Sequence, residues 1–430
     1  MNNESTIDFK QLETESGETE LSPPEMFAAH LIEWALERHA SDLFVSDVDN
    51  AVMVSLRRLG KIEPVRKLAR AYGHRLQGHL RVLAGADAGE TVRPIEGRGV
   101  ITTPSGSQAQ LRLSSVPTLF GQDVALRLFD PARGAMRLDE LGIDEEDVQT
   151  LQMLLERPSG LILVTGPVVS GKSCTLYAML AALNDGTRKI HTIEDPIEYS
   201  LSGVMQSQIN SRLSIDFPDL LSAVLRHSPD VVMIGEVRDQ ETARTAIRAG
   251  ASGQLVLATV HSKTAAEGVE MMLQYEDKHK FLSTALIGVI SQRLVKRLCP
   301  ECRQEVSLGQ PVAVPDRVAP RLHGAEPKLY RPGGCEVCHG DGFDSLKCIP
   351  EIMVVDQAIQ DAITNRAETS QLEALAVQNG MLRLPEVALS YVLRGYTTAE
   401  EAFRVVNDPE LATLAGRIAA AESPADESVN

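Results

Sequence analysis

The clearest chemistry in the sequence lies at residues 166–173, which match the phosphate-binding pattern G-x-x-x-x-G-K-[ST]. An apolar stretch at 161–165 precedes this loop and a helix is expected at 172–183, which is the context that the motif requires. Backbone N–H groups of such a loop bind phosphate oxygens, although an ordinary glycine-rich turn is the alternative. Lys172 would reach the β and γ phosphates, and the Ser173 hydroxyl would bind Mg²⁺. The residues expected to hold ATP are Gly166, Ser170, Gly171, Lys172, Ser173 and Cys174.

A second candidate is the apolar segment 230–236, which ends in Glu236. A carboxylate at a strand end beside a phosphate loop can orient or deprotonate an attacking water, or hold Mg²⁺ through water. The nearby Asp239 has a simpler interpretation as the cap of the next helix. Because the phosphate loop is present in the same chain, we favour Glu236 as a catalytic residue.

Two more expected strands end in polar residues. The segment 189–194 ends in Glu194, and Asp195 and Glu198 follow, a carboxylate cluster that fits metal binding and water positioning. The segment 254–260 leads into His261, which stands where a γ-phosphate sensor could stand, although a lone histidine is more often structural. Ligands of open α/β sheets bind at the carboxyl ends of the strands, so we expect Glu194, Glu198 and His261 to assist Glu236.

Four of the six cysteines form two C-x-x-C pairs, Cys299 with Cys302 and Cys335 with Cys338. Four thiolates suit a structural Zn²⁺ ion, which leaves no open position for catalysis. Free thiols and a redox pair are the alternatives; a redox site needs only one pair, near a thioredoxin-like pattern. We therefore expect these four residues to bind Zn²⁺, and Cys348 to be a packed thiol.

The pattern of apolar residues predicts two folded parts. Residues 25–130 combine a helix at about 24–38, a strand pair at 51–62 and a β-meander at 99–129, which indicates an α+β domain. In 135–298 short apolar strands alternate with helices, which is typical of a parallel sheet in an α/β domain.

The remaining segments are expected to be less regular. Residues 1–24 and 416–430 are polar and are expected to be disordered, and 299–350 is expected to be a loop-rich metal-binding segment. Amphipathic helices are expected in 351–415. With no signal peptide or apolar stretch of membrane-spanning length, we expect a cytoplasmic protein. The net charge of −17 argues against a nucleic-acid partner.

The motifs, taken in order, resemble the ATPases of type II secretion and type IV pilus assembly. The similar segments include TIEDPIEY at 192–199, SPDVVMIGEVRD at 228–239 and SGQLVLATVHS at 252–262. The resemblance implies a RecA-like ATPase domain, a small N-terminal domain of PAS-like fold and a hexameric ring. It further implies that the N-terminal domain supplies Arg112 and Arg127 to the bound nucleotide. Solvated strand arginines are the alternative interpretation of these two residues.

The resemblance also implies a role and a partner. The two C-x-x-C pairs favour pilus assembly or protein export over pilus retraction, with an inner-membrane platform protein as partner and a peripheral location at that membrane. Val168 and Val169 replace the usual Thr-Gly of the phosphate loop, and Gln254 replaces a usual histidine. A nucleotide-binding paralogue with weak or no hydrolysis is therefore the alternative, and a nucleic-acid translocase is a less favoured one.

Overall fold

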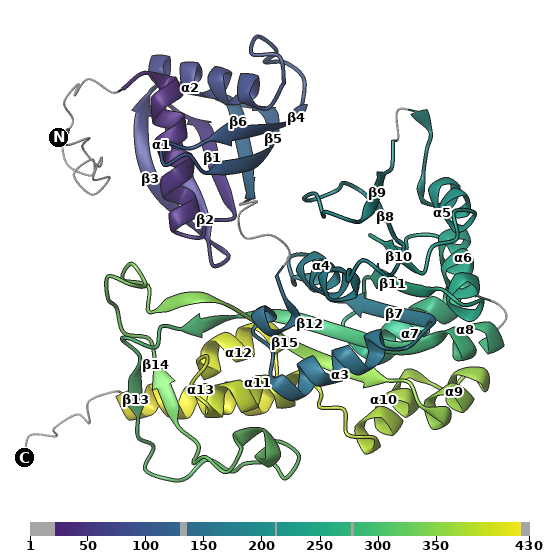
Figure 1. The fold of residues 1–430 in the computed structure, drawn as a ribbon. Helices are drawn as coiled ribbons and strands as arrows, with labels where there is room; N and C mark the ends of the chain where they lie inside the picture. Colours follow the sequence, from purple (N-terminus) through teal and green to yellow (C-terminus); the bar gives the residue numbers. More distant parts are fainter. Residues whose placement is uncertain (1–21, 130–135, 211–212, 277–278, 423–430) are drawn as a thin grey trace, which may run out of the picture. The chain divides into compact units, whose positions relative to one another are not determined.

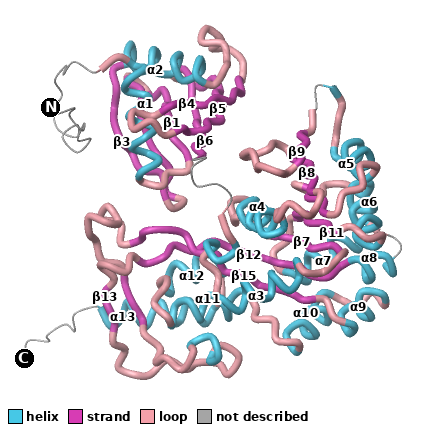
Figure 2. The backbone as a smooth tube through the Cα atoms, in the orientation of Figure 1, coloured by secondary structure: helices cyan, strands magenta, loops and turns pink. Residues whose placement is uncertain are grey.

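The structure is a computed structural model that describes residues 22–129, 136–210, 213–276 and 279–422. Its contacts divide the chain into two compact units, residues 1–134 and 135–430. The expected N-terminal tail lies almost wholly outside the described residues. Figures 1 and 2 show the two units, each of which combines helices with one main sheet.

The first unit is an antiparallel sheet with two helices. The sheet has the strand order β3-β2-β1-β6-β5-β4. Its strands are β1 (Asp42–Val48), β2 (Ala51–Arg58), β3 (Lys61–Ala69), β4 (Ile95–Thr102), β5 (Gln108–Thr118) and β6 (Gly121–Phe129). Alternate residues of β1, β2, β5 and β6 are buried, so one face packs against the helices α1 (Pro24–Glu37) and α2 (Arg70–Leu83). The sequence patterns indicated α1 and the meander but not α2, whose buried residues are spaced among many charged ones.

The second unit is built on a seven-stranded sheet of order β15-β12-β7-β11-β10-β8-β9. All neighbouring strands are parallel except β12 and β15, which pair antiparallel at one edge. The strands are β7 (Gly160–Thr165), β8 (Ile190–Glu194), β9 (Met205–Gln208), β10 (Val231–Ile234), β11 (Leu255–Val260), β12 (Leu286–Leu298) and β15 (Phe343–Val354). The central strands β7 and β11 are buried throughout, which explains their continuous apolar sequences.

Helices cover both faces of this sheet. One face packs against the 3₁₀ helix η3 (Leu138–Leu141) and the helices α3 (Glu145–Leu155) and α4 (Lys172–Leu183). The other face packs against α5 (Phe217–Leu225), α6 (Gln240–Ala251), α7 (Ala265–Tyr275), α8 (His279–Ala285), α9 (Gln357–Thr364) and α10 (Thr369–Gln378). Helices with buried apolar sides on both faces of a parallel sheet confirm the expected α/β fold class.

The C-terminal part packs on the β12–β15 edge of the sheet (Figure 1). It contains the small strands β13 (Gln304–Val306) and β14 (Leu329–Arg331), the 3₁₀ helix η5 (Ala319–Leu322), and the helices α11 (Leu384–Leu393), α12 (Ala399–Val406) and α13 (Pro409–Glu422). No helix of the described residues is both long and apolar enough to cross a membrane.

Two expectations for this region were wrong. Residues 343–349 were expected in a loop, but they begin β15, which adds a long strand to the main sheet. Residues 416–422 were expected to be disordered, but they belong to α13. The helix is ordered because Leu411, Leu414 and Ile418 are buried in the same apolar cluster as α11 and α12.

Candidate active site and metal centre

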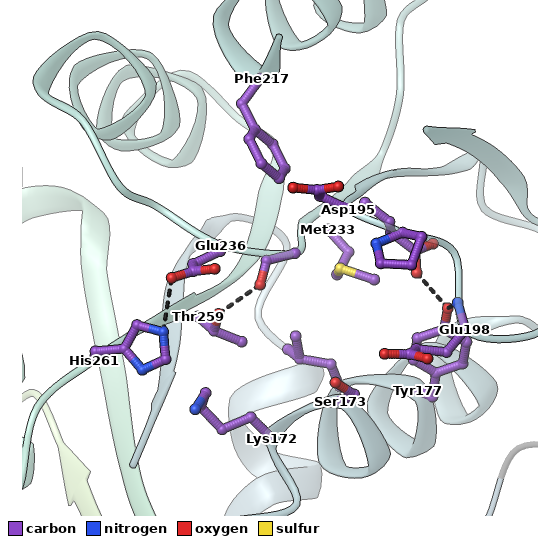
Figure 3. Close-up of a pocket in the computed structure, with 14 residues that line it drawn as sticks. Lys172, Ser173, Tyr177, Asp195, Glu198, Phe217, Met233, Glu236, Thr259 and His261 are labelled. Atoms are coloured by element: carbon purple, nitrogen blue, oxygen red, sulfur yellow. Dashed lines mark hydrogen bonds and ion pairs between the residues drawn. The ribbon is translucent and has the colours of Figure 1, made fainter. Parts of the chain in front are cut away.

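The carboxyl ends of the parallel strands meet at one edge of the second sheet, where the sequence placed its polar candidates. β7 leads into the phosphate loop, β8 ends at Glu194, β10 is followed by Glu236 and β11 by His261. A cavity of about 150 Å³ opens there. Pockets that enclose a whole ligand have about 300–1,000 Å³, so this cavity fits the phosphate end of a nucleotide. Its lining includes Glu194. Figure 3 labels five other lining residues, Lys172, Ser173, Glu198, Glu236 and His261.

The phosphate loop has positive backbone φ angles at three of its residues. Gly166, Val169 and Gly171 have φ angles of 147°, 65° and 88°. A positive φ is a steric outlier for a β-branched residue such as Val169. The side chains of Val168 and Val169 are exposed, at 80% and 76%, so they occupy none of the cavity. Val169, where the resemblance puts a glycine, therefore carries backbone strain.

Lys172 opens helix α4 and turns back toward the loop. Its Nζ donates hydrogen bonds to the carbonyl oxygens of Gly166, at 2.8 Å, and Pro167, at 3.0 Å. Burial, partly opposed by the negative charge of Glu236, lowers the pKa of Lys172. The hydroxyl of Ser170 is buried without a hydrogen-bond partner among the described residues. A partly desolvated ammonium and an unpartnered hydroxyl in one loop fit the binding of an anion such as a phosphate.

Gln292 of β12 supports the phosphate loop and was missed by the sequence analysis. Its Nε2 donates to the carbonyl oxygen of Ser170 at 2.8 Å, and its Oε1 accepts from the Thr175 hydroxyl at 2.9 Å. The side chain is 1% exposed, so both hydrogen bonds form in a dry environment. No sequence motif marks it, because β12 itself was not recognised as a strand beside the loop.

Glu236 faces the cavity between two nitrogen-bearing partners, His261 and Arg238. Its Oε1 lies 2.7 Å from His261 Nε2, and its Oε2 accepts from Arg238 Nε at 2.7 Å. Partial burial acts to raise the pKa of Glu236, but Arg238 and His261 outweigh it and hold the pKa below its usual value. The carboxylate is therefore ionised at neutral pH and fixed in orientation (Figure 3).

Glu194 lines the cavity but directs its carboxylate to protein partners. It is 3% exposed and accepts hydrogen bonds from the hydroxyls of Tyr177 and Thr192 and from Gln206. The carboxylates of 194–198 do not converge on one point, since the only metal-binding group of three or more His, Cys, Asp or Glu in the described chain is the cysteine cluster. Cys174 is absent from the cavity lining.

Arg112 and Arg127 belong to the first unit, where they are direct cross-strand partners on β5 and β6. Arg127 also faces Asp42 of β1, with Nε 3.2 Å from Oδ1. Two arginines placed opposite each other repel, which a bound anion would relieve.

The four predicted cysteines come together in one cluster. Their sulfur atoms lie within 4.8 Å of one another, and three pairs, Cys299–Cys335, Cys302–Cys338 and Cys335–Cys338, are 3.8, 3.7 and 3.7 Å apart. A tetrahedral ion with Zn–S bonds of about 2.3 Å requires sulfurs about 3.8 Å apart, so the cluster fits Zn²⁺. Gly333 is required here, because a Cβ atom on it would lie 2.0 Å from the carbonyl oxygen of Cys302.

A phosphate loop after the first strand of a parallel sheet, with a glutamate and a histidine at neighbouring strand ends, defines a RecA-like P-loop NTPase. The chain matches the family described as Type II/IV secretion system protein over residues 17–404, and it belongs to this family. It is thus an ATPase of the kind that the sequence resemblance indicated.

Named relatives and solved structures agree with this assignment. Type II secretion system protein E of Dickeya dadantii is 36% identical over 375 residues, which cover 87% of this chain and 74% of that protein. Type IV pilus assembly ATPase PilB of Thermus thermophilus is 33% identical over 390 residues, which cover 89% of this chain and 43% of that protein. The pilus retraction motor PilT with bound ADP superimposes with a TM-score of 0.60 at 26% identity, covering 91% of this chain and 98% of that one. The Legionella pneumophila ATPase DotB shares the fold, with a TM-score of 0.65 at 17% identity, covering 90% of this chain and 96% of that one.

Proposed function

We propose that this chain hydrolyses ATP as the motor of a type II secretion or type IV pilus assembly machine. The observation that carries the proposal is the close contact between Glu236 Oε1 and His261 Nε2, 2.7 Å apart, in the same cavity as Lys172 and Ser173. The relatives named for type II secretion and type IV pilus assembly support this choice of machine. The motor acts as a homo-hexamer at the cytoplasmic side of the inner membrane, docked on a platform protein.

Each residue of the site has a role in this proposal. The N–H groups of the phosphate loop and Lys172 hold the β and γ phosphates. Ser173 would hold Mg²⁺, which neutralises developing phosphate charge when bound. Glu236 accepts a hydrogen bond from the attacking water, and His261 and Arg238 fix its orientation. Glu194 holds the Tyr177 hydroxyl beside the backbone N–H of Glu198 and so shapes the cavity wall.

Arg112 and Arg127 of the first unit contact the γ-phosphate in this proposal. Loss of that phosphate on hydrolysis releases the two units from each other, and the ring passes the motion to its membrane partner. The four cysteines would hold Zn²⁺, which would stabilise the segment that links β12 to β15.

The weakly hydrolysing paralogue remains the second candidate because of Val168, Val169 and Gln254. The structure offers little support for it. The two valines are exposed and do not line the cavity, and Gln254 precedes β11, at the end of that strand opposite to His261. None of these three substituted positions lines the cavity.

Steady-state ATPase activity with Mg²⁺ tests the proposal. The purified chain is expected to turn over ATP, and Lys172→Ala and Glu236→Gln are each expected to lower turnover by about a hundredfold or more. Glu236→Gln should still bind ATP, because the phosphate loop is intact. A parent protein that binds ATP but turns over no faster than these variants would show that the chain is a nucleotide-binding structural subunit.

A further inference from the structure

Three polar side chains stand side by side on adjacent strands of the second sheet. Thr165, the last residue of β7, is paired with Ser291 of β12, and Ser291 is paired with Glu351 of β15. The three residues are buried, with exposed fractions of 0%, 0% and 3%. We call them the polar row. The sequence analysis assigned no role to any of them.

The polar row bonds three residues of the segment that follows His261, Ser262, Lys263 and Ala265. The Ser262 N–H donates to Thr165 Oγ1 at 2.7 Å, and the Ser291 hydroxyl donates to the Lys263 carbonyl oxygen at 3.0 Å. The Ala265 N–H donates to Glu351 Oε1 at 2.7 Å. Residues 262–265, here called the His261 loop, are therefore anchored along their length to β7, β12 and β15.

Glu351 makes its second contact with a different helix. Its Oε2 accepts from the Leu384 N–H at 3.2 Å, and Leu384 is the first residue of α11, just as Ala265 is the first residue of α7. A carboxylate at two helix N-termini satisfies backbone donors that have no partner within either helix. A buried carboxylate destabilises the fold unless it is hydrogen-bonded in this way. The position therefore requires a side chain with two acceptor oxygens, one for each helix N-terminus.

We propose that Glu351 is a positioning residue for ATP hydrolysis, which acts by anchoring the His261 loop so that His261 meets Glu236. The proposal rests on the proposed function, in which His261 and Glu236 serve the reaction. The phosphate loop has its own support, since Gln292, the residue after Ser291, bonds Ser170 and Thr175. Loss of Glu351 is therefore expected to disturb the chemical step and to leave nucleotide binding in place.

The first test measures turnover and nucleotide affinity of the full chain. Glu351→Gln keeps the shape of the side chain but turns an amide N–H₂ toward one of the two backbone donors. We expect kcat to fall about tenfold, because small displacements of a catalytic group have effects of this size or larger. The Kd of a fluorescent ADP analogue should stay within about twofold.

Asp356→Ala is the control for stability. Asp356 is also a helix-capping carboxylate, and it accepts from the Ile359 N–H of α9 at 2.9 Å, away from the His261 loop. Loss of this cap should lower thermal stability and leave kcat unchanged. An equal fall in kcat for both variants would overturn the proposal, since it would reflect general loss of stability.

The second test is a double-mutant cycle with His261→Ala. If Glu351 acts through His261, the double variant turns over no more slowly than His261→Ala alone. Effects that multiply would overturn the inference and leave the proposed function standing. If His261→Ala alone leaves kcat unchanged, the role of His261 in the proposed function fails, and a fall with Glu351→Gln would then have another cause. If Glu351→Gln does not fold, Ser291→Ala, which removes the hydrogen bond to Lys263, takes its place in the same cycle with His261→Ala.

Discussion

At the scale of single residues, the strain at Val169 can be measured. The left-handed backbone conformation destabilises a non-glycine residue by roughly 1–2 kcal/mol. Replacing that residue by glycine removes the strain, but it lowers the free energy of unfolding by roughly 0.5–1 kcal/mol because the unfolded chain gains conformational entropy. Val169 has a φ of 65°, so the two effects nearly cancel, and Val169→Gly should change the free energy of unfolding little. Val168, equally exposed and without a positive φ, should lose about 0.5–1 kcal/mol as Val168→Gly. Chemical denaturation of both variants measures the difference, and equal losses would mean that Val169 is not strained.

A second residue, His191 of β8, should make the protein sensitive to acid. Both ring nitrogens lack a hydrogen-bond partner among the described residues, and the side chain is 8% exposed. Burial, together with Lys189 and His227, lowers the pKa of His191 in the folded state. The unfolded chain then binds the proton better, so stability is complete above pH ~6.5 and falls below it.

The variant His191→Leu removes this titration. Its free energy of unfolding should change less between pH 7.5 and 5.5 than that of the parent, as followed by urea denaturation at several pH values. His227→Gln, at the neighbouring histidine, should keep most of the acid sensitivity. An unchanged pH dependence in His191→Leu would assign the effect to other groups.

At the scale of elements, the parts that the sequence predicted well are those with local signals. The phosphate loop with α4, and β7 and β11, show a motif or a continuous apolar run, and they lie where expected. β12 and β15 carry a weaker signal, because the buried polar residues Gln292, Lys296 and Glu351 interrupt their apolar residues. From the sequence alone, polar residues at such positions are predicted to be exposed to solvent. The support that these strands give to the phosphate loop and to the His261 loop was therefore visible only in the fold.

The cysteine cluster is also an element-scale feature, and its proposed zinc site can be tested by substitution. The segment between β12 and β15 has few regular elements beyond β13, β14 and η5, so a bound ion should contribute much of its order. Cys299→Ser should lower the bound zinc, measured by a colorimetric chelator, from about one ion per chain to near zero, and should lower the melting temperature. Cys348→Ser, a buried thiol outside the cluster, should keep its zinc. Equal zinc in both variants would exclude the four-cysteine site.

At the scale of the whole molecule, the proposed motor requires both units, because the phosphate loop belongs to the second and Arg112 to the first. If Arg112 contacts the γ-phosphate, Arg112→Ala should lower kcat by about a hundredfold, the usual cost of removing one charge-stabilising donor. Binding of ADP, which lacks that phosphate, should be nearly unchanged.

Arg98 is the matched control, since it pairs with Arg112 across β4 and β5. Arg98→Ala removes the same charge one strand away and should keep most activity. Equal losses of kcat in the two variants would mean that the arginines of the first unit act through their overall positive charge. An unchanged kcat in Arg112→Ala would mean that Arg112 takes no part in the reaction.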